Sequence, residues 1–142
     1  MDKKNMKVAV YFRPATTPIE QKVWLYASSE QAEWRDLSVE AMKHTALQNG
    51  LVVAGVSTDS SRQLPPMERP GVQEMLAAVH EGRVGAVMMP SLRHLGRELD
   101  AILPVLAEFQ KQEVHIHAKD ASALSLPLFP KPPSKGKGGD AR

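Results

Sequence analysis

The sequence contains no cysteine, which excludes disulfide bonds, thiolate metal sites and cysteine-based nucleophilic catalysis. No apolar run approaches the roughly 20 residues that are needed to span a bilayer. Residues 1–6 lead directly into a strand-like run and lack the apolar core of a signal peptide. We therefore expect a soluble cytoplasmic protein that makes no membrane contact. The net charge is only +2, which permits contact with nucleic acid without requiring it.

The length of 142 residues is that of one domain, and 42% hydrophobic with 24% charged residues is a globular composition. No internal repeat is present. After about Ala123 the composition shifts toward proline, glycine and lysine. We therefore predict a folded domain over residues 1–123 and a disordered tail over residues 124–142.

Apolar, strand-like runs alternate with segments of helical periodicity. The predicted strands are residues 7–12, 51–56, 84–89 and 114–117, and the predicted helices are about 30–49, 71–81 and 97–112. Pro104 lies inside the third helix and should kink or restart it. This order predicts an α/β three-layer sandwich, in which a mostly parallel four-stranded sheet carries helices on both faces. Ligands of such sheets bind beyond the carboxyl ends of the strands.

Three arginines stand at the ends of predicted strands or helices. Arg13 follows the first strand, Arg69 precedes the second helix, and Arg97 begins the third helix. The planar guanidinium group suits phosphate oxygens, and helix N-termini favour anions. These three residues therefore form a candidate phosphate site. The alternative is that they are solvated surface charges or partners in loop ion pairs.

The spacing of three segments resembles the N-terminal catalytic domain of the serine recombinases, the resolvase/invertase family. The segments are Tyr11-Phe12-Arg13-Pro14-Ala15-Thr16, Glu68-Arg69-Pro70-Gly71 and Ser91-Leu92-Arg93-His94-Leu95-Gly96-Arg97. The resemblance covers roughly residues 7–121 and implies the resolvase-like fold. It also implies a site-specific DNA recombinase ancestry, in which a serine attacks the DNA phosphate.

The sequence departs from the family pattern at the positions that carry the chemistry. Ala15 stands where the family has its serine nucleophile, and alanine cannot form the covalent phosphoserine link. Arg93 and His94 stand where the family has Asp and Arg. The resemblance thus implies a catalytically inactive homologue, while an active recombinase with a non-standard nucleophile such as Thr16 is the alternative.

The expected partner of an inactive homologue is DNA, bound weakly and without sequence preference, because no helix-turn-helix pattern is present to read a groove. A recombinase partner and self-association are further possibilities, and a decaying remnant of a mobile element is a third reading. His115 and His117 form an H-x-H pair on a predicted strand and could bind a metal. No third ligand is evident, so we expect neither a metal nor a cofactor, and the role of the pair stays open.

Overall fold

The computed structural model of the protein describes residues 17–61 and 63–120. Within these residues it has four strands, three α-helices and three short 3-10 helices. In chain order they are η2 (Ile19–Gln21), β1 (Lys22–Ser28), α1 (Ala32–Gln48), β2 (Val52–Asp59), η3 (Pro66–Glu68), α2 (Pro70–His80), β3 (Ala86–Met88), η4 (Leu92–His94), α3 (Leu99–Lys111) and β4 (His115–His117). None of the helices in this described part is long and apolar enough to cross a membrane.

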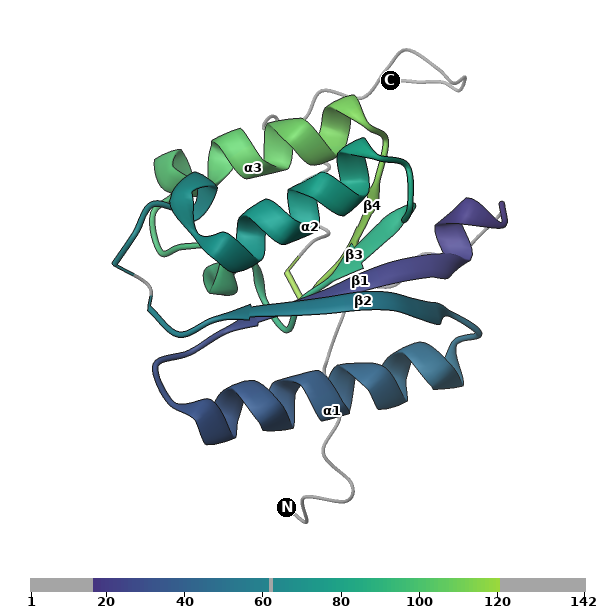
Figure 1. Ribbon diagram of the computed structural model, residues 1–142, viewed down its shortest axis with the longest axis horizontal. Coiled ribbons are helices and arrows are strands. Elements are labelled where there is room, and N and C mark those ends of the chain that lie inside the picture. The colour runs from purple at the N-terminus through teal and green to yellow at the C-terminus, as the bar shows by residue number, and fades with distance from the viewer. Residues whose placement is uncertain (1–16, 62, 121–142) are drawn as a thin grey trace.

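The four strands form one sheet in the order β2-β1-β3-β4, and all three strand pairs are parallel. Helix α1 covers one face of the sheet, and α2 and α3 cover the other (Figure 1). The predicted three-layer α/β architecture is therefore confirmed. Each crossover helix returns the chain to the starting end of the sheet, so every strand ends at the same edge.

A strand that the sequence analysis did not predict lies at the centre of the sheet. Strand β1, residues 22–28, pairs with β2 on one side and with β3 on the other. Residues 23–27 are apolar, as a strand covered on both faces requires. The predicted strand over residues 7–12 lies outside the described residues and stays a prediction.

Alternate side chains of β1 serve the two cores. Val23 and Leu25 pack with α1 in one cluster, whereas Trp24 and Tyr26 pack with α2 and α3 in the other. Residues 23–28 are all buried. A strand that contributes to both cores fixes the register of its neighbours, and the residues at its carboxyl end are held firmly in consequence.

Two other boundaries differ from expectation. Strand β2 continues to Asp59, beyond the predicted end at residue 56. Helix α3 runs through Pro104 as one helix, so the restart that we considered does not occur. Pro104 is exposed, and the carbonyl group that lacks its amide partner can bind water there.

Candidate functional site

The candidate site lies where β1, β2 and β3 end, beneath the loop of residues 89–98. Ser28 closes β1, Asp59 closes β2, and η4 carries His94 across the end of β1. Arg69 lies immediately before α2, whose first turn faces the same edge. The edge therefore gathers residues from four separate segments of the chain, as the α/β architecture predicts for a binding site.

A buried polar cluster joins Tyr26, Asp59 and Arg69. The Tyr26 hydroxyl donates to Asp59 Oδ2 at 2.8 Å, and Arg69 Nη1 lies 3.4 Å from the same hydroxyl oxygen. Asp59 Oδ1 accepts the backbone N–H of Gly71 at 2.8 Å, in the first turn of α2. Burial raises the pKa of Tyr26 far above its usual value of 10.0, so this hydroxyl remains a donor at every physiological pH.

Gly71 is required by this arrangement. A Cβ atom at that position would lie 2.6 Å from Asp59 Oδ2 and 2.7 Å from the carbonyl oxygen of Thr58. The missing side chain lets the start of α2 approach the end of β2 closely. The carboxylate of Asp59 thereby reaches an N–H of the helix N-terminus, where a negative charge is favourable.

Arg69 is committed to contacts within the protein. Its side chain is 2% exposed, its Nε donates to the Leu64 carbonyl at 3.0 Å, and its Nη1 donates to the His94 carbonyl at 2.9 Å. These bonds tie the loop before α2 to the loop after β3. The guanidinium is therefore a structural tie and is not the solvated surface charge of the alternative interpretation, while its role in phosphate binding stays a prediction.

Ser28 donates two hydrogen bonds to His94 at the end of β1. The Ser28 backbone N–H donates to His94 Nδ1 at 3.0 Å, and the Ser28 hydroxyl donates to the His94 carbonyl at 2.7 Å. Because Nδ1 accepts a hydrogen bond, the neutral imidazole carries its hydrogen on Nε2. Ser28 is fully buried, and its hydroxyl proton is held by a carbonyl oxygen, which is no general base.

The loop after β3 is anchored by Asp120. The Ser91 hydroxyl donates to Asp120 Oδ2 at 3.1 Å, and the Leu92 N–H donates to Asp120 Oδ1 at 3.0 Å. The same Ser91 oxygen accepts the N–H of Arg93 and caps η4. Arg93 is exposed, as is Arg97 further along the loop. The loop thus presents two cationic side chains from a fixed backbone.

The predicted site residues divide into two groups. Arg69 and His94 come into direct contact, and Arg97 lies on the same loop as His94. Arg13, Ala15 and Thr16 lie outside the described residues, so the convergence of all three predicted arginines stays a prediction.

Sequence reasoning did not select Tyr26 or Ser28 as site residues. The available signal was the apolar run over residues 23–27, which is of strand length and is followed directly by Ser28 and Ser29. Asp59 is different, because the sequence already places it just after the second predicted strand, at an edge where ligands bind.

The H-x-H pair lies on the edge strand β4. The two imidazole ring centroids are 6.4 Å apart, and His115 Nε2 lies 3.3 Å from a carboxylate oxygen of Glu20 in η2. Among residues 17–61 and 63–120, no group of three or more His, Cys, Asp or Glu side chains is arranged to hold a metal ion. This contact between His115 and Glu20 joins η2 to the edge strand of the sheet.

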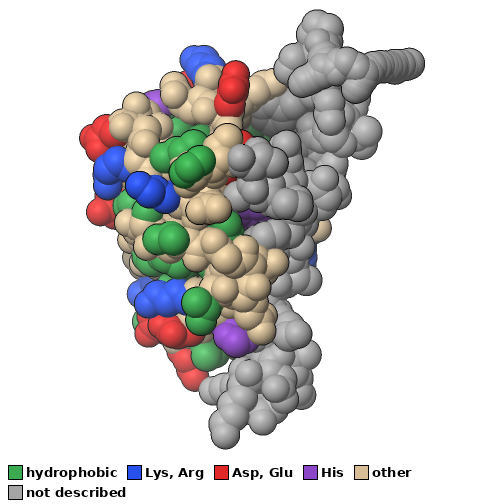
Figure 2. Space-filling view, turned by 90° about the vertical axis from the view of Figure 1, so that its right-hand side faces the viewer, with side chains coloured by type: hydrophobic (Ala, Val, Ile, Leu, Met, Phe, Trp, Pro, Cys, Tyr) green, Lys and Arg blue, Asp and Glu red, His purple; other side chains and the backbone are tan. Residues whose placement is uncertain are grey.

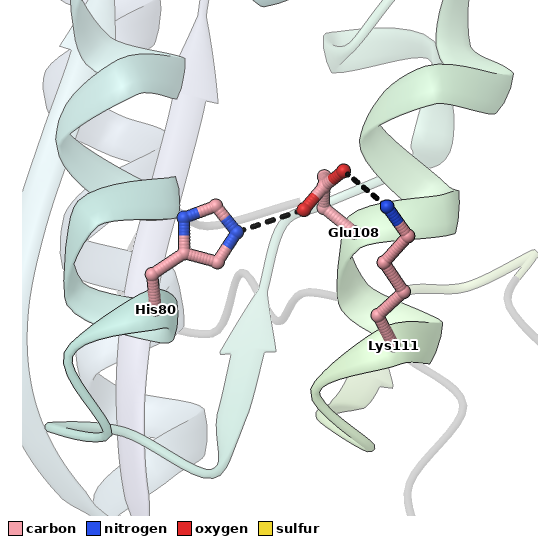
Figure 3. A network of polar contacts seen from close by, with 3 residues as sticks. All are labelled: His80, Glu108 and Lys111. Atoms are coloured by element: carbon pink, nitrogen blue, oxygen red, sulfur yellow. Dashed lines mark hydrogen bonds and ion pairs between the residues drawn. The ribbon is translucent and has the colours of Figure 1, made fainter.

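A second polar cluster links the two helices on the opposite side from α1. His80 Nε2 lies 2.8 Å from Glu108 Oε1, and Lys111 Nζ lies 3.3 Å from Glu108 Oε2 (Figure 3). The hydrogen bond with His80, followed by the one with Lys111, holds the pKa of Glu108 below its usual value of 4.5. His80 ends α2, so this cluster lies away from the carboxyl edge.

Comparison with known proteins assigns the chain to a family. Residues 26–127 match the model of the resolvase N-terminal domain, and the chain therefore belongs to that family. The matched segment begins at Tyr26 in β1. The segment Tyr11–Thr16, on which the prediction of a missing serine rests, lies before it.

Solved structures of serine recombinases share the fold. The N-terminal catalytic domain of TP901-1 integrase is 21% identical, with a TM-score of 0.61 over 71% of this chain and 79% of that one. The C-terminal catalytic domain of ISC1926 TnpA, an IS607-like serine recombinase, is 20% identical, with a TM-score of 0.59 over 69% and 68%. A resolvase-family site-specific recombinase from Streptococcus pneumoniae is 22% identical, with a TM-score of 0.55 over 67% and 69%. No curated protein matches the chain.

Proposed function

We propose that this resolvase-family domain does not cleave DNA and instead binds DNA phosphates through the loop after β3. The observation that carries the proposal is that the side chain of Arg69 is bonded within the protein. It is 2% exposed and donates to two backbone carbonyls and to the Tyr26 hydroxyl. These bonds engage Nε and Nη1, so a phosphate could be held by either of these two atoms only if the bonds broke. The phosphate contacts are made by the exposed cations Arg93 and Arg97.

Within residues 17–61 and 63–120, the environment of Ser28 supports the same proposal. Phosphoryl transfer needs an accessible nucleophile and preorganised charge around the phosphate. Ser28 is buried, and its hydroxyl is bonded to the His94 carbonyl. Cleavage through Ser28 would require the η4 loop to move away from β1. Ala15, at the position where the resemblance puts the nucleophile, offers no hydroxyl.

An active recombinase is the second candidate function, and the position of Ser29 favours it. Ser29 directly follows β1 at the start of the family-matched segment and is only half-buried. Its hydroxyl oxygen accepts the N–H of Gln31 at 3.1 Å, which leaves its proton available. Thr16 remains the other candidate nucleophile.

The cleavage experiment separates the two candidates. The full chain and the variants Ser28→Ala, Ser29→Ala and Thr16→Ala are incubated with supercoiled plasmid and with a nicked suicide duplex, and nicks and covalent protein–DNA adducts are scored. We expect no adduct from any of the four proteins. An adduct formed by the native chain would overturn the proposal, and its loss in one variant would identify the nucleophile.

The binding experiment tests the phosphate contacts. Fluorescence anisotropy with two unrelated duplexes should give equal, weak affinities that fall steeply with salt, because only backbone contacts are available. Arg93→Gln combined with Arg97→Gln should lower the slope of log K against log salt by about 2, at roughly 0.9 per phosphate contact. Deletion of residues 127–142 should also remove much of the affinity.

Lys43→Gln is the matched control, since Lys43 is an exposed cation on α1 that pairs with Glu40. This variant should bind DNA as the native chain does. A tight, sequence-selective complex at physiological salt would contradict the proposal. Binding to a purified recombinase or to a second copy of the chain, with no binding to DNA, would favour a partner-binding module instead.

A further inference from the structure

Strand β2 forms an open edge of the sheet. It bonds to β1 along one side, and no described strand pairs with its other side. It is eight residues long and contains neither lysine nor proline, the residues that commonly protect an exposed edge. After the register shift opposite Val23 and Trp24, residues 55–59 run in unbroken register with β1. This regular stretch is a template for one more strand.

Two apolar side chains of β2 are exposed among the described residues. Val52 is 57% exposed and Val56 is 36% exposed, although both are large apolar residues. Val56 lies in register with Leu25, which packs against α1, so the exposed apolar side of Val56 borders the α1 layer. Ala54 and Thr58, two residues to either side, are exposed as well. An additional strand with apolar residues on the α1 side would bury this strip.

We propose that residues 7–12 of the same chain add to β2 as a fifth, antiparallel strand. These residues read Lys-Val-Ala-Val-Tyr-Phe and lie outside the described residues. Alternation places Val8, Val10 and Phe12 on one face of an extended strand. Pairing this face with the α1 side aligns Val10 with Val56, and the six residues then span positions 54–59, which include the regular part of β2.

The connection to Thr17 is long enough for this pairing and sets its direction. Thr17 precedes η2, which lies at the end where the strands begin: the Ile19 carbonyl lies against Gly85, just before β3, and Glu20 contacts His115. A strand beyond β2 lies three strand spacings from β3, or about 14 Å. The five Cα–Cα steps from residue 12 to Thr17 reach about 17 Å. Residues 7–12 must therefore end at this side of the sheet, which makes them antiparallel to β2.

Figure 2 views the side from which β1 begins and shows exposed hydrophobic side chains among the charged ones. The other edge of the sheet fits the segment less well, because β4 is only three residues long. A second copy of the chain could also supply a strand to β2. The covalent tether favours the segment of the same chain, since a short link corresponds to an effective concentration in the millimolar range.

Disulfide trapping tests the pairing directly, because the chain has no native cysteine. Val10→Cys is combined with Val56→Cys on β2 or, as the matched control, with Ile116→Cys on β4. After mild oxidation of the full chain, we expect at least ten times more monomeric disulfide in the β2 pair than in the β4 pair. Preferential linkage to β4 would overturn the proposal, as would links between isotope-labelled copies or no link in either pair.

Amide hydrogen exchange provides a second, independent measurement. Val10→Asp should speed exchange at least tenfold at those amides of residues 54–59 that do not bond to β1, because it breaks the apolar face of the added strand. Lys7→Gln is the control and should leave these rates unchanged. Unaltered exchange in Val10→Asp would overturn the proposal. The result is independent of DNA binding, since the edge of β2 is separate from the loop that carries Arg93.

Discussion

Replacing Tyr26 by phenylalanine tests the buried cluster on which the candidate site is built. The change removes one oxygen atom and leaves the ring, so it opens no large cavity in the core. Asp59 loses the hydroxyl that donates to its Oδ2 at 2.8 Å and keeps the N–H of Gly71 on Oδ1. Asp59 is 7% exposed, so water cannot readily replace the lost donor.

The expected cost follows from the type of bond that is lost. A hydrogen bond to a charged group contributes about 1.5–3 kcal/mol, and leaving a buried acceptor unsatisfied costs about the same. We expect Tyr26→Phe to lower the free energy of unfolding by about 2 kcal/mol. For a domain of this size that corresponds to a fall in Tm of about 8 °C. In urea the midpoint should fall by about 1 M with an unchanged m value.

A double-mutant cycle isolates the bond from other effects of the substitution. In an Asp59→Asn background the acceptor charge is gone, and Tyr26→Phe should cost less than about 1 kcal/mol. Urea unfolding followed by tryptophan fluorescence measures all four proteins. A cost below about 0.5 kcal/mol in the native background would refute the reasoning. An equal cost in the two backgrounds would show that the hydroxyl acts through something other than Asp59.

Three further predictions concern the reaction, the helix pair and the start of α2. Ala15→Ser alone should restore no plasmid cleavage, because a serine hydroxyl needs activating surroundings that the chain lacks; efficient nicking by this variant would contradict the inactive assignment. The lowered pKa of Glu108 means that its contacts stabilise the fold above the unfolded value of 4.5 and lose this effect as the pH falls through the folded pKa. Glu108→Gln should therefore flatten the acid limb of a Tm-against-pH curve, whereas Glu74→Gln, an exposed change on α2, should not. Gly71→Ala should lower Tm by at least several degrees, since its Cβ would meet the Asp59 carboxylate at 2.6 Å; an unchanged Tm would show that the helix start can shift at little cost.

The sequence predicted the helices of the fold more reliably than its strands, because it gave no strand over residues 22–28. Helices near residues 30–49, 71–81 and 97–112 were confirmed, because helical periodicity is a local property. Residues 7–12 and 22–28 are both apolar runs of strand length, and nothing local decides which of them lies in the centre. Strand β1 lies in the centre because its side chains are buried on both faces and contribute to both cores.

The family membership and the α/β class follow from the sequence by itself, since alternation of apolar strands and amphipathic helices admits few other architectures. The sequence also supplied Arg69, His94 and Arg97 as residues of interest at loop positions. Only the tertiary structure decided that Arg69 is buried and bonded to the His94 carbonyl. Burial and hydrogen-bond partners arise from segments 25 to 43 residues apart along the chain, and no local pattern encodes such contacts. For that reason the same arginine that the sequence suggests as a phosphate ligand is, in the folded chain, a tie between β1, the loop before α2 and the loop after β3.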